Sequence, residues 1–213
     1  MMKALIVPQP IANDVMLGQQ ALIAFPYAPD EGVTEFLMVS GKEPLPDEYS
    51  LGLAMGYQLG IVTINQVSKS RDVPGFYEWE VAPKMLVAPK AMDIAPDTFV
   101  DVAPTDYEEL ELETIGLFAW IAEPHADFSE ALQAHADALI AIGSKQMPAK
   151  YREILARTGS WQEVDAAWED DQFEHRNHHM LEHGIPEINF GHTHAHAHDD
   201  VPTFKLKSKH DSE

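Results

Sequence analysis

Apolar residues in the first hundred positions occur in short runs separated by proline and glycine, a pattern that predicts β-strands. The runs are residues 4–7 (ALIV), 35–39 (EFLMV), 60–67 (GIVTINQV), 76–81 (FYEWEV) and 84–87 (KMLV). A brief helix is expected at residues 11–17, because Pro10 suits a helix start and Gly18 a helix end. Several short strands joined by turns predict a small β-barrel.

From Thr105 onward the pattern changes to helices with recognisable N-terminal caps. Capping boxes or close relatives begin at Thr105, Asp127 and Ser160. A helix over residues 127–142 is expected to end at Gly143. Its predicted apolar face carries Phe128, Leu132, His135, Leu139 and Ile142.

Two more helices are predicted before the pattern ends. One begins near Pro148 and closes at Gly159, and the other runs from Trp161 to about His183 and stops at Gly184. After Pro186 the residues are mainly His, Asp, Lys and Ser without periodicity, which is typical of a mobile tail. The sequence therefore predicts an α+β protein in three parts: a barrel at 1–103, an acidic helical segment at 104–185 and a His-rich tail at 186–213.

Composition limits the classes of chemistry and location. The chain has 213 residues, of which 45% are hydrophobic, enough to bury a core. The absence of cysteine excludes disulfides, thiolate metal sites and cysteine nucleophiles. The first fourteen residues lack the apolar region of a signal peptide, and no apolar stretch reaches the length of a membrane span. These features predict a soluble, cytoplasmic protein without a membrane partner.

Negative charge is concentrated in the second half. The formal net charge is −21; residues 1–103 contribute −7 and residues 104–213 contribute −14. Such a field opposes general binding to phosphate backbones, because counterion release requires a basic surface. The acidic residues form either an ordinary solvated surface, or a surface that meets a basic protein or imitates nucleic acid.

Four segments of the first hundred residues resemble a known family when they are taken together in order. They are Met2-Lys3-Ala4-Leu5 with Gln9-Pro10 and Ala12, Gly32 to Lys42, Leu59 to Val67, and Tyr77 to Leu86 with its Tyr-x-Trp. In this respect the region resembles an ASCH domain of the PUA-like superfamily. The resemblance implies a small PUA-like β-barrel with short helices, here followed by the α-helical extension, and a cleft that recognises RNA or a modified nucleobase.

The chain departs from the family at the positions that matter for catalysis. ASCH domains usually follow their first helix with Gly-x-Lys-x-x-Glu-x-Arg, and some members use the lysine and an acid to remove an acyl group from a modified cytidine. Here Gln20, Ile23 and Phe25 occupy the lysine, glutamate and arginine positions. Glutamine and isoleucine supply neither a tunable amine nor proton transfer. We therefore expect no hydrolase activity and no catalytic residues.

The resemblance implies a ligand-binding set in the cleft. Gln9 and Asn13 are suited to hydrogen-bond the edge of a base, Gln20 takes the lysine position beside them, and Tyr77 and Trp79 are suited to stack on a base. The alternative for the two aromatic residues is core packing, which is the commoner role of aromatic side chains in a strand.

Basic residues are few in the first half. Lys69, Arg71, Lys84 and Lys90 form the notable group. They either border a nucleic-acid face or are simply solvated.

Eight of the eleven histidines lie between residues 175 and 198. His175, His179 and His183 recur every fourth residue, so a helix stacks them on one face, where imidazoles one turn apart can chelate a divalent cation. His192, His194, His196 and His198 alternate along the tail, which can take up zinc or nickel opportunistically. The alternative is a solvated tail with incidental metal affinity, and no cofactor is required.

The leading functional hypothesis is a non-catalytic ASCH-like domain that recognises RNA or a modified nucleobase. The alternative is an acidic module that engages a basic protein partner, as a phage-type accessory or inhibitor protein does. A third hypothesis is a nucleoside amidohydrolase with a replaced active site, for which Glu78, Glu80 and Lys84 are the nearest substitutes for the missing groups.

Overall fold

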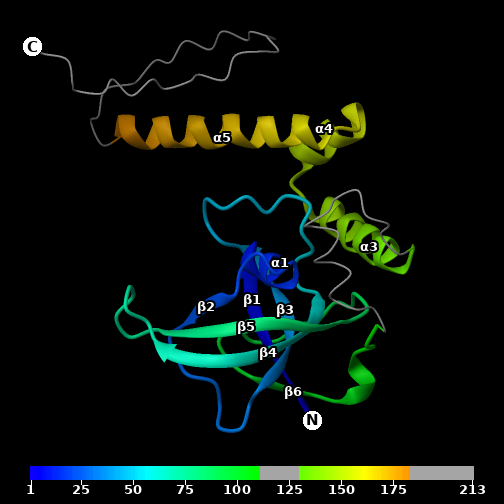
Figure 1. Cartoon of the computed structure of the whole chain (residues 1–213). Coiled ribbons are helices and arrows are strands. Elements are labelled where there is room, and N and C mark those ends of the chain that lie inside the picture. Colours follow the sequence, from blue (N-terminus) through cyan, green and yellow to red (C-terminus); the bar gives the residue numbers. More distant parts are fainter. Residues whose placement is uncertain (111–129, 183–213) are drawn as a thin grey trace, which may run out of the picture. The chain divides into compact units, whose positions relative to one another are not determined.

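A computed structural model of the chain describes residues 1–110 and 130–182 (Figure 1). The strands are β1 (Met2–Gln9), β2 (Leu22–Phe25), β3 (Glu35–Pro44), β4 (Gln58–Lys69), β5 (Tyr77–Leu86) and β6 (Val100–Val102). The helices are α1 (Ile11–Met16), the 3₁₀ turn η1 (Pro104–Asp106), α3 (Glu130–Gln146), α4 (Ala149–Thr158) and α5 (Trp161–Glu182). The predicted α+β class is therefore confirmed.

The chain divides into two compact units, Met1–Trp168 and Glu169–Glu213. The first unit contains the whole sheet together with α1, α3, α4 and the start of α5. The helices α3 and α4 thus share one unit with the sheet, whereas most of α5 belongs to the second unit.

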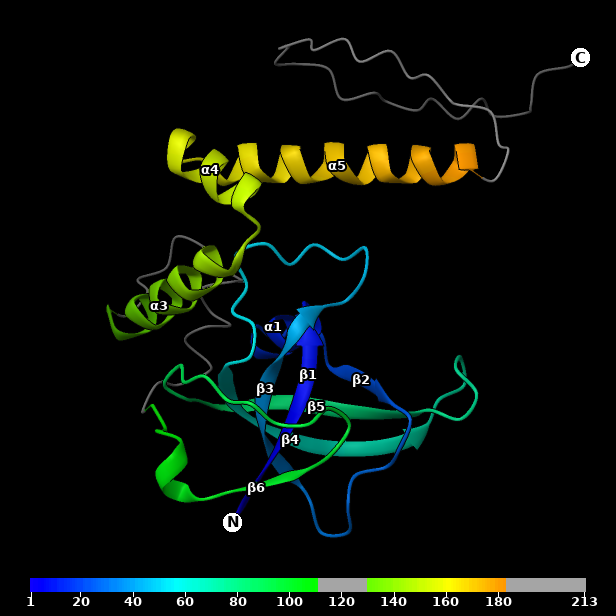
Figure 2. The same ribbon diagram turned by 180° about the vertical axis from the view of Figure 1, so that it is seen from behind.

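The six strands form one mixed sheet in the order β2-β5-β4-β3-β1-β6 (Figure 2). β1 pairs in parallel with β3, with Ala4 beside Leu37, and the other neighbours are antiparallel. β2 and β6 lie at opposite edges and do not pair with each other, so the sheet is open. The closed barrel that the strand pattern predicts is not confirmed.

β3 carries a continuous apolar run at residues 36–39, where both faces of the sheet are covered. Phe36, Leu37, Met38 and Val39 of β3 are all fully buried. Phe36 and Met38 belong to the larger core on one face, whereas Leu37 and Val39 belong to a smaller core on the other. Continuous apolar runs are typical of strands that are buried on both faces.

Strand positions agree with the sequence pattern in the centre of the sheet and differ at its edges. The segments at 76–81 and 84–87 form one strand, β5, in which Pro83 lies opposite Val62 at a register shift. Such an irregularity accommodates a residue without a backbone N–H. β3 continues beyond the expected stop at Ser40-Gly41 as far as Pro44, and the edge strands β2 and β6 have no counterpart in the prediction.

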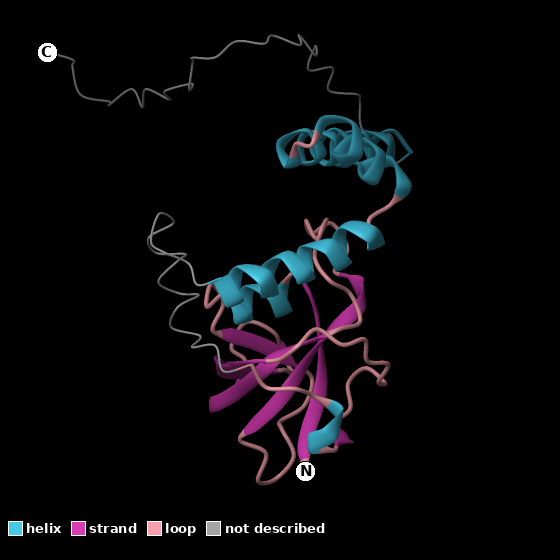
Figure 3. Cartoon of the chain, turned by 90° about the vertical axis from the view of Figure 1, so that its right-hand side faces the viewer, coloured by secondary structure: helices cyan, strands magenta, loops and turns pink. Residues whose placement is uncertain are grey.

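α3 lies beside α1 at one end of the sheet (Figure 3). Its described residues begin at Glu130, and Leu132 is part of the larger core. The helix continues through Gly143 rather than ending there, so the predicted end is wrong. Gly143 is needed for contact instead, because an added Cβ would lie 1.9 Å from the carbonyl oxygen of Gly52.

The segment between β3 and β4 connects the sheet to the helices. Gln146 of α3 donates to the Met55 carbonyl over 2.9 Å and accepts from the Met55 N–H over 2.8 Å. The indole of Trp161 lies over Gly52, where an added Cβ would be 2.5 Å from the ring. The same segment therefore contacts both α3 and the start of α5.

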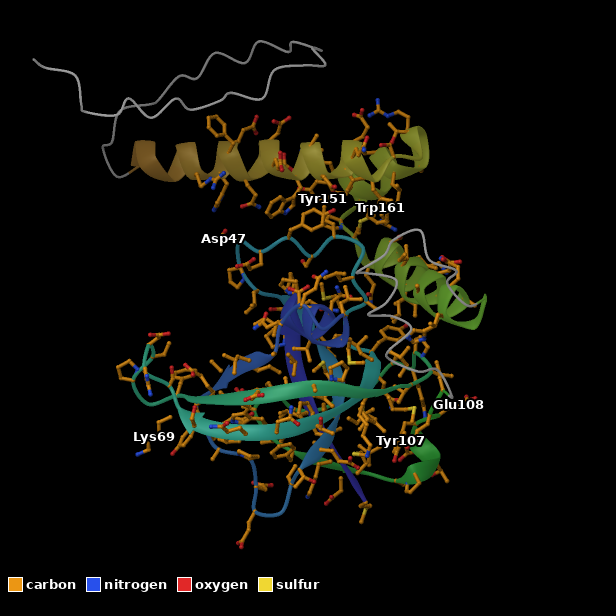
Figure 4. All side chains as sticks on the ribbon, viewed as in Figure 1. Asp47, Lys69, Tyr107, Glu108, Tyr151 and Trp161 are labelled. Carbon is orange, nitrogen blue, oxygen red and sulfur yellow. The ribbon has the colours of Figure 1, made fainter. Side chains whose placement is uncertain are left out.

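α4 and the start of α5 form a small apolar cluster of their own. Val164, Tyr151 and Met147 are its buried members, and the side chains of Tyr151 and Trp161 point into it (Figure 4). Gly159 ends α4 in the left-handed conformation at φ 63°, which confirms the predicted helix end. α5 also begins at the expected residue.

We predict that Gly143→Ala destabilises the protein. Helix propensity alone favours alanine by about 1 kcal/mol, whereas the collision with the Gly52 carbonyl opposes it. Overpacking of this kind typically costs about 1–3 kcal/mol, so the net free energy of unfolding is expected to fall. Urea denaturation measures this free energy of unfolding.

Ala141→Gly is the matched control for this prediction, because Ala141 is exposed on the same helix. It is expected to lose about 1 kcal/mol through propensity alone. A stabilising Gly143→Ala substitution would show that α3 is not packed on the Gly52 backbone.

Candidate functional site

A cavity of about 260 Å³ lies between α1, residues 52–54 and α3. Leu59 of β4 and Leu86 of β5 line it from the sheet, and α3 contributes Leu132, Gln133, His135, Ala136, Leu139 and Ile140. None of the described residues that line it is an Asp, Glu, Lys or Arg. The cavity is slightly smaller than the range of about 300–1,000 Å³ that is typical of ligand pockets. Its chemistry suits a small, uncharged and largely apolar molecule.

Two of the predicted ligand-binding residues, Gln9 and Asn13, line this cavity. Gln9 is 1% exposed and its amide is fully engaged, because Nε2 donates to the Ala54 carbonyl over 3.0 Å and Oε1 accepts from the Asn13 N–H over 3.0 Å. Gln9 thus joins β1, α1 and the 52–54 segment at the cavity wall. The half-buried Asn13 side chain makes no hydrogen bond within the described part of the chain and is free to meet a ligand.

His135 lines the same cavity from α3. Both of its ring nitrogens are buried and, among the described residues, neither has a hydrogen-bond partner. Burial lowers the pKa of His135 below its ordinary value of 6.5, so the imidazole is neutral at neutral pH. A neutral imidazole presents one donor and one acceptor. The sequence pattern places His135 on the apolar face of this helix, but it carries no signal that the residue faces a cavity.

The other three residues of the predicted ligand set lie elsewhere. Gln20 is not part of the cavity lining, and its Nε2 donates to the Leu22 carbonyl over 2.7 Å. Trp79 is fully buried, and its Nε1 donates to the Tyr27 carbonyl over 3.1 Å. Tyr77 is partly buried against the same core.

The indole of Trp79 is enclosed by other aromatic rings. Phe99 stacks on it with centroids 6.0 Å apart, Phe25 lies 4.4 Å away, and Phe36 meets it edge-on. No face of the ring is open to a base, so in this structure Trp79 is a core residue. This is the core-packing alternative that the strand pattern left open.

Two of the three residues that stand at the positions of the ASCH lysine, glutamate and arginine pattern, Ile23 and Phe25, are buried, whereas Gln20 is partly exposed. Ile23 is 2% and Phe25 is 5% exposed, and both belong to the larger core. The candidate substitutes do not line the cavity either: Glu78 accepts from the Ser70 hydroxyl over 2.7 Å, and Lys84 pairs with Glu35. The Glu35 partner raises the pKa of the Lys84 ammonium, which keeps it charged rather than nucleophilic.

The four expected cations do not form one basic surface. Lys84 pairs with Glu35, and Lys90 donates to the Asp106 carbonyl over 2.9 Å. Lys69 lies at the tip of the β4–β5 hairpin next to the exposed Arg71, at the opposite end of the sheet from Tyr107 and Glu108 (Figure 4). Only the hairpin pair remains available for a phosphate.

Most of the expected metal ligands lie outside the residues whose side chains are described. This applies to His179, His183, His192, His194, His196 and His198, whereas His175 is exposed on α5. Within the described residues, no group of three or more His, Asp or Glu side chains gathers in a metal-binding arrangement. The metal hypothesis for the tail stays a prediction.

Comparison with known proteins adds no relative. No protein-family model matches the chain, and no curated protein matches its sequence. Among the described helices, none is long and apolar enough to cross a membrane. The resemblance to ASCH domains therefore stays a prediction from the residues quoted above.

We predict that Gln9→Leu destabilises the protein although leucine fits an apolar site. The change leaves the Ala54 carbonyl and the Asn13 N–H without their partner, and each buried unpaired group costs about 1–3 kcal/mol. The free energy of unfolding in urea is expected to fall by about 2 kcal/mol or more. The exposed Gln19→Leu is the control and should change stability by less than about 0.5 kcal/mol.

We expect Trp79→Ala to cost about 3–5 kcal/mol of stability, as large-to-small core substitutions do. Thermal denaturation monitored by circular dichroism measures this loss. A variant that keeps the melting temperature of the wild type would contradict the burial of this ring. A loss of binding in Trp79→Ala has no bearing on ligand contact unless the fold is intact.

Proposed function

We propose that the first compact unit is a non-catalytic binding module for a small, uncharged heterocycle of the modified-nucleobase class. The observation that carries this proposal is the cavity bordered by Gln9, Asn13 and His135. A modified base combines a planar, largely apolar body with a hydrogen-bonding edge. The cavity offers the corresponding combination of many apolar walls and a few polar groups, which is the usual composition of a ligand site.

The absence of charge along the cavity wall supports binding without catalysis. Hydrolysis of an amide needs a nucleophile or a base near the scissile carbonyl and a donor for the oxyanion. Among the described residues, no carboxylate, lysine, serine or threonine lines the cavity, and His135 is the one titratable group that does. The apolar Ile23 and Phe25, buried at the family's catalytic positions, agree with this proposal.

The distribution of cations favours a free base or nucleoside over an RNA strand. A polymer needs several lysine or arginine contacts to its phosphates. Lys84 and Lys90 are already bound within the protein, and the exposed pair Lys69 and Arg71 lies at the tip of the hairpin, away from the cavity-lining residues. Recognition of the base alone requires none of these contacts.

The proposal predicts direct and salt-insensitive binding of a base. Isothermal titration calorimetry of the full chain against free and modified bases and nucleosides should give saturable binding. The dissociation constant is expected to change little between about 50 and about 200 mM salt, because no phosphate contact is lost. Oligonucleotides of the same bases should bind no more tightly than the monomers.

Ala136→Trp tests whether the cavity is the binding site. Ala136 lines the cavity and Ala138 is exposed on the same helix, so Ala138→Trp is a matched control with the same added ring. Filling the cavity should weaken binding at least tenfold, about 1.4 kcal/mol, while the control binds as the wild type does. Equal affinities in the two variants place the site elsewhere, and the absence of base binding by the wild type rejects the proposal and favours a protein partner.

A further inference from the structure

Among the described residues, buried polar atoms without a hydrogen-bond partner occur on Tyr27, Gln58 and His135, and of these three residues only His135 lines the cavity. The buried Gln9 amide is satisfied at both ends, and Gln58 keeps two contacts through its Nε2, to Asp106 and Met92. Within the described residues, His135 has neither of its two nitrogens paired. A buried polar group without a partner typically lowers stability by about 1–3 kcal/mol. The unpaired imidazole at the cavity wall therefore needs a physical reason that offsets this cost.

The position of His135 suggests why its imidazole is left without a protein partner. It lies on α3, outside the segment that resembles an ASCH domain, and it lines the cavity together with Asn13 of α1. The two side chains therefore reach one cavity from two different helices. Each offers a donor and an acceptor, since a primary amide and a neutral imidazole both carry both functions.

We propose that His135 is a specificity-determining residue, which hydrogen-bonds the polar edge of the ligand from α3 while Asn13 does so from α1. This inference rests on the proposed function. The ligand it selects is a neutral heterocycle with donor and acceptor groups on more than one side of the ring. A purely apolar molecule of the same size leaves the imidazole unpaired and binds less well, because the desolvated polar group stays unsatisfied.

The surroundings of His135 make ligand binding depend on whether its imidazole is neutral or protonated. No carboxylate lines the cavity from the described side chains of α1, residues 52–54, β4, β5 or α3. The acidic residues nearest in sequence to the cavity residues are Asp14 on α1 and the exposed Asp137, which accepts from Gln133 over 2.8 Å. An imidazolium in the cavity has no counterion and is disfavoured by burial, so the ligand binds the neutral form.

The experiment is a pH series of ligand affinities for the wild type, His135→Leu and His135→Gln. The probe is the tightest-binding base from the calorimetric panel that does not itself titrate between about pH 5 and about pH 8, the range around the ordinary histidine pKa. Wild-type affinity should fall as the pH is lowered through the pKa of His135. His135→Leu should weaken binding at neutral pH by a few-fold to about tenfold, the worth of one hydrogen bond, and should remove the pH dependence.

His135→Gln keeps a neutral donor and acceptor, so it should retain most of the affinity and lose the pH dependence as well. His175→Gln is the matched control, because His175 is exposed on α5 and should leave the wild-type profile unchanged. A melting curve at each pH confirms that every variant is folded.

The outcomes separate this inference from the proposed function. A wild type that binds no base rejects the proposed function. Base binding that Ala136→Trp abolishes, but that His135→Leu leaves unchanged in affinity and pH profile, keeps the cavity site and overturns the role of His135. A pH dependence that persists in His135→Leu assigns the titration to another group and likewise overturns it.

Discussion

The close approach of the Gly52 backbone to Gly143 is the contact on which the rest of the first unit depends. Gly143 approaches Gly52 so closely that an added Cβ on Gly143 would lie 1.9 Å from the Gly52 carbonyl oxygen. This brings α3 against the segment between β3 and β4, and Gln146 fixes the alignment through its two hydrogen bonds to Met55. Because the Trp161 ring also lies against Gly52, one short segment contacts two helices, α3 and the start of α5.

The cavity follows from this arrangement. α1 and the sheet supply one wall, and α3 supplies the other, so the space exists only while α3 is docked. The buried side-chain amide of Gln9, a residue of β1, links α1 and Ala54 at the cavity wall through two hydrogen bonds. At this wall Gln9 and Gln133 have partners within the protein, whereas the two His135 nitrogens have none among the described residues, which leaves them for a ligand.

The protein surface and the cavity wall differ in charge. The acidic side chains are mostly on the surface, and several cations are paired with nearby acids, as Lys3 is with Asp101 and Lys42 with Asp93. In contrast, no charged side chain lines the cavity within residues 1–110 and 132–176, whose side chains the structure describes. A neutral ligand enters such a space without a desolvated ion pair, so shape and a few hydrogen bonds decide its affinity. The helical half thus contributes a wall of the site as well as negative charge.

The sequence by itself determined the helices and strands whose positions depend only on neighbouring residues. The central strands follow from continuous apolar runs, α4 from Pro148 and Gly159, and α1 from Pro10 and Gly18, because turn and cap preferences depend on neighbouring residues. Composition likewise limited the chemistry, since a chain without cysteine has no thiolate sites.

Only the tertiary structure decided which of these residues meet. It made Gly143 a contact instead of a helix end, left the sheet open at β2 and β6, buried Trp79 in the core, and brought His135 to the same cavity as Gln9 and Asn13. These outcomes depend on the packing of segments far apart in the chain. The periodicity of apolar residues indicates which face of a helix or strand is apolar. It does not indicate which other helix or strand packs on that face, or where this packing leaves a cavity.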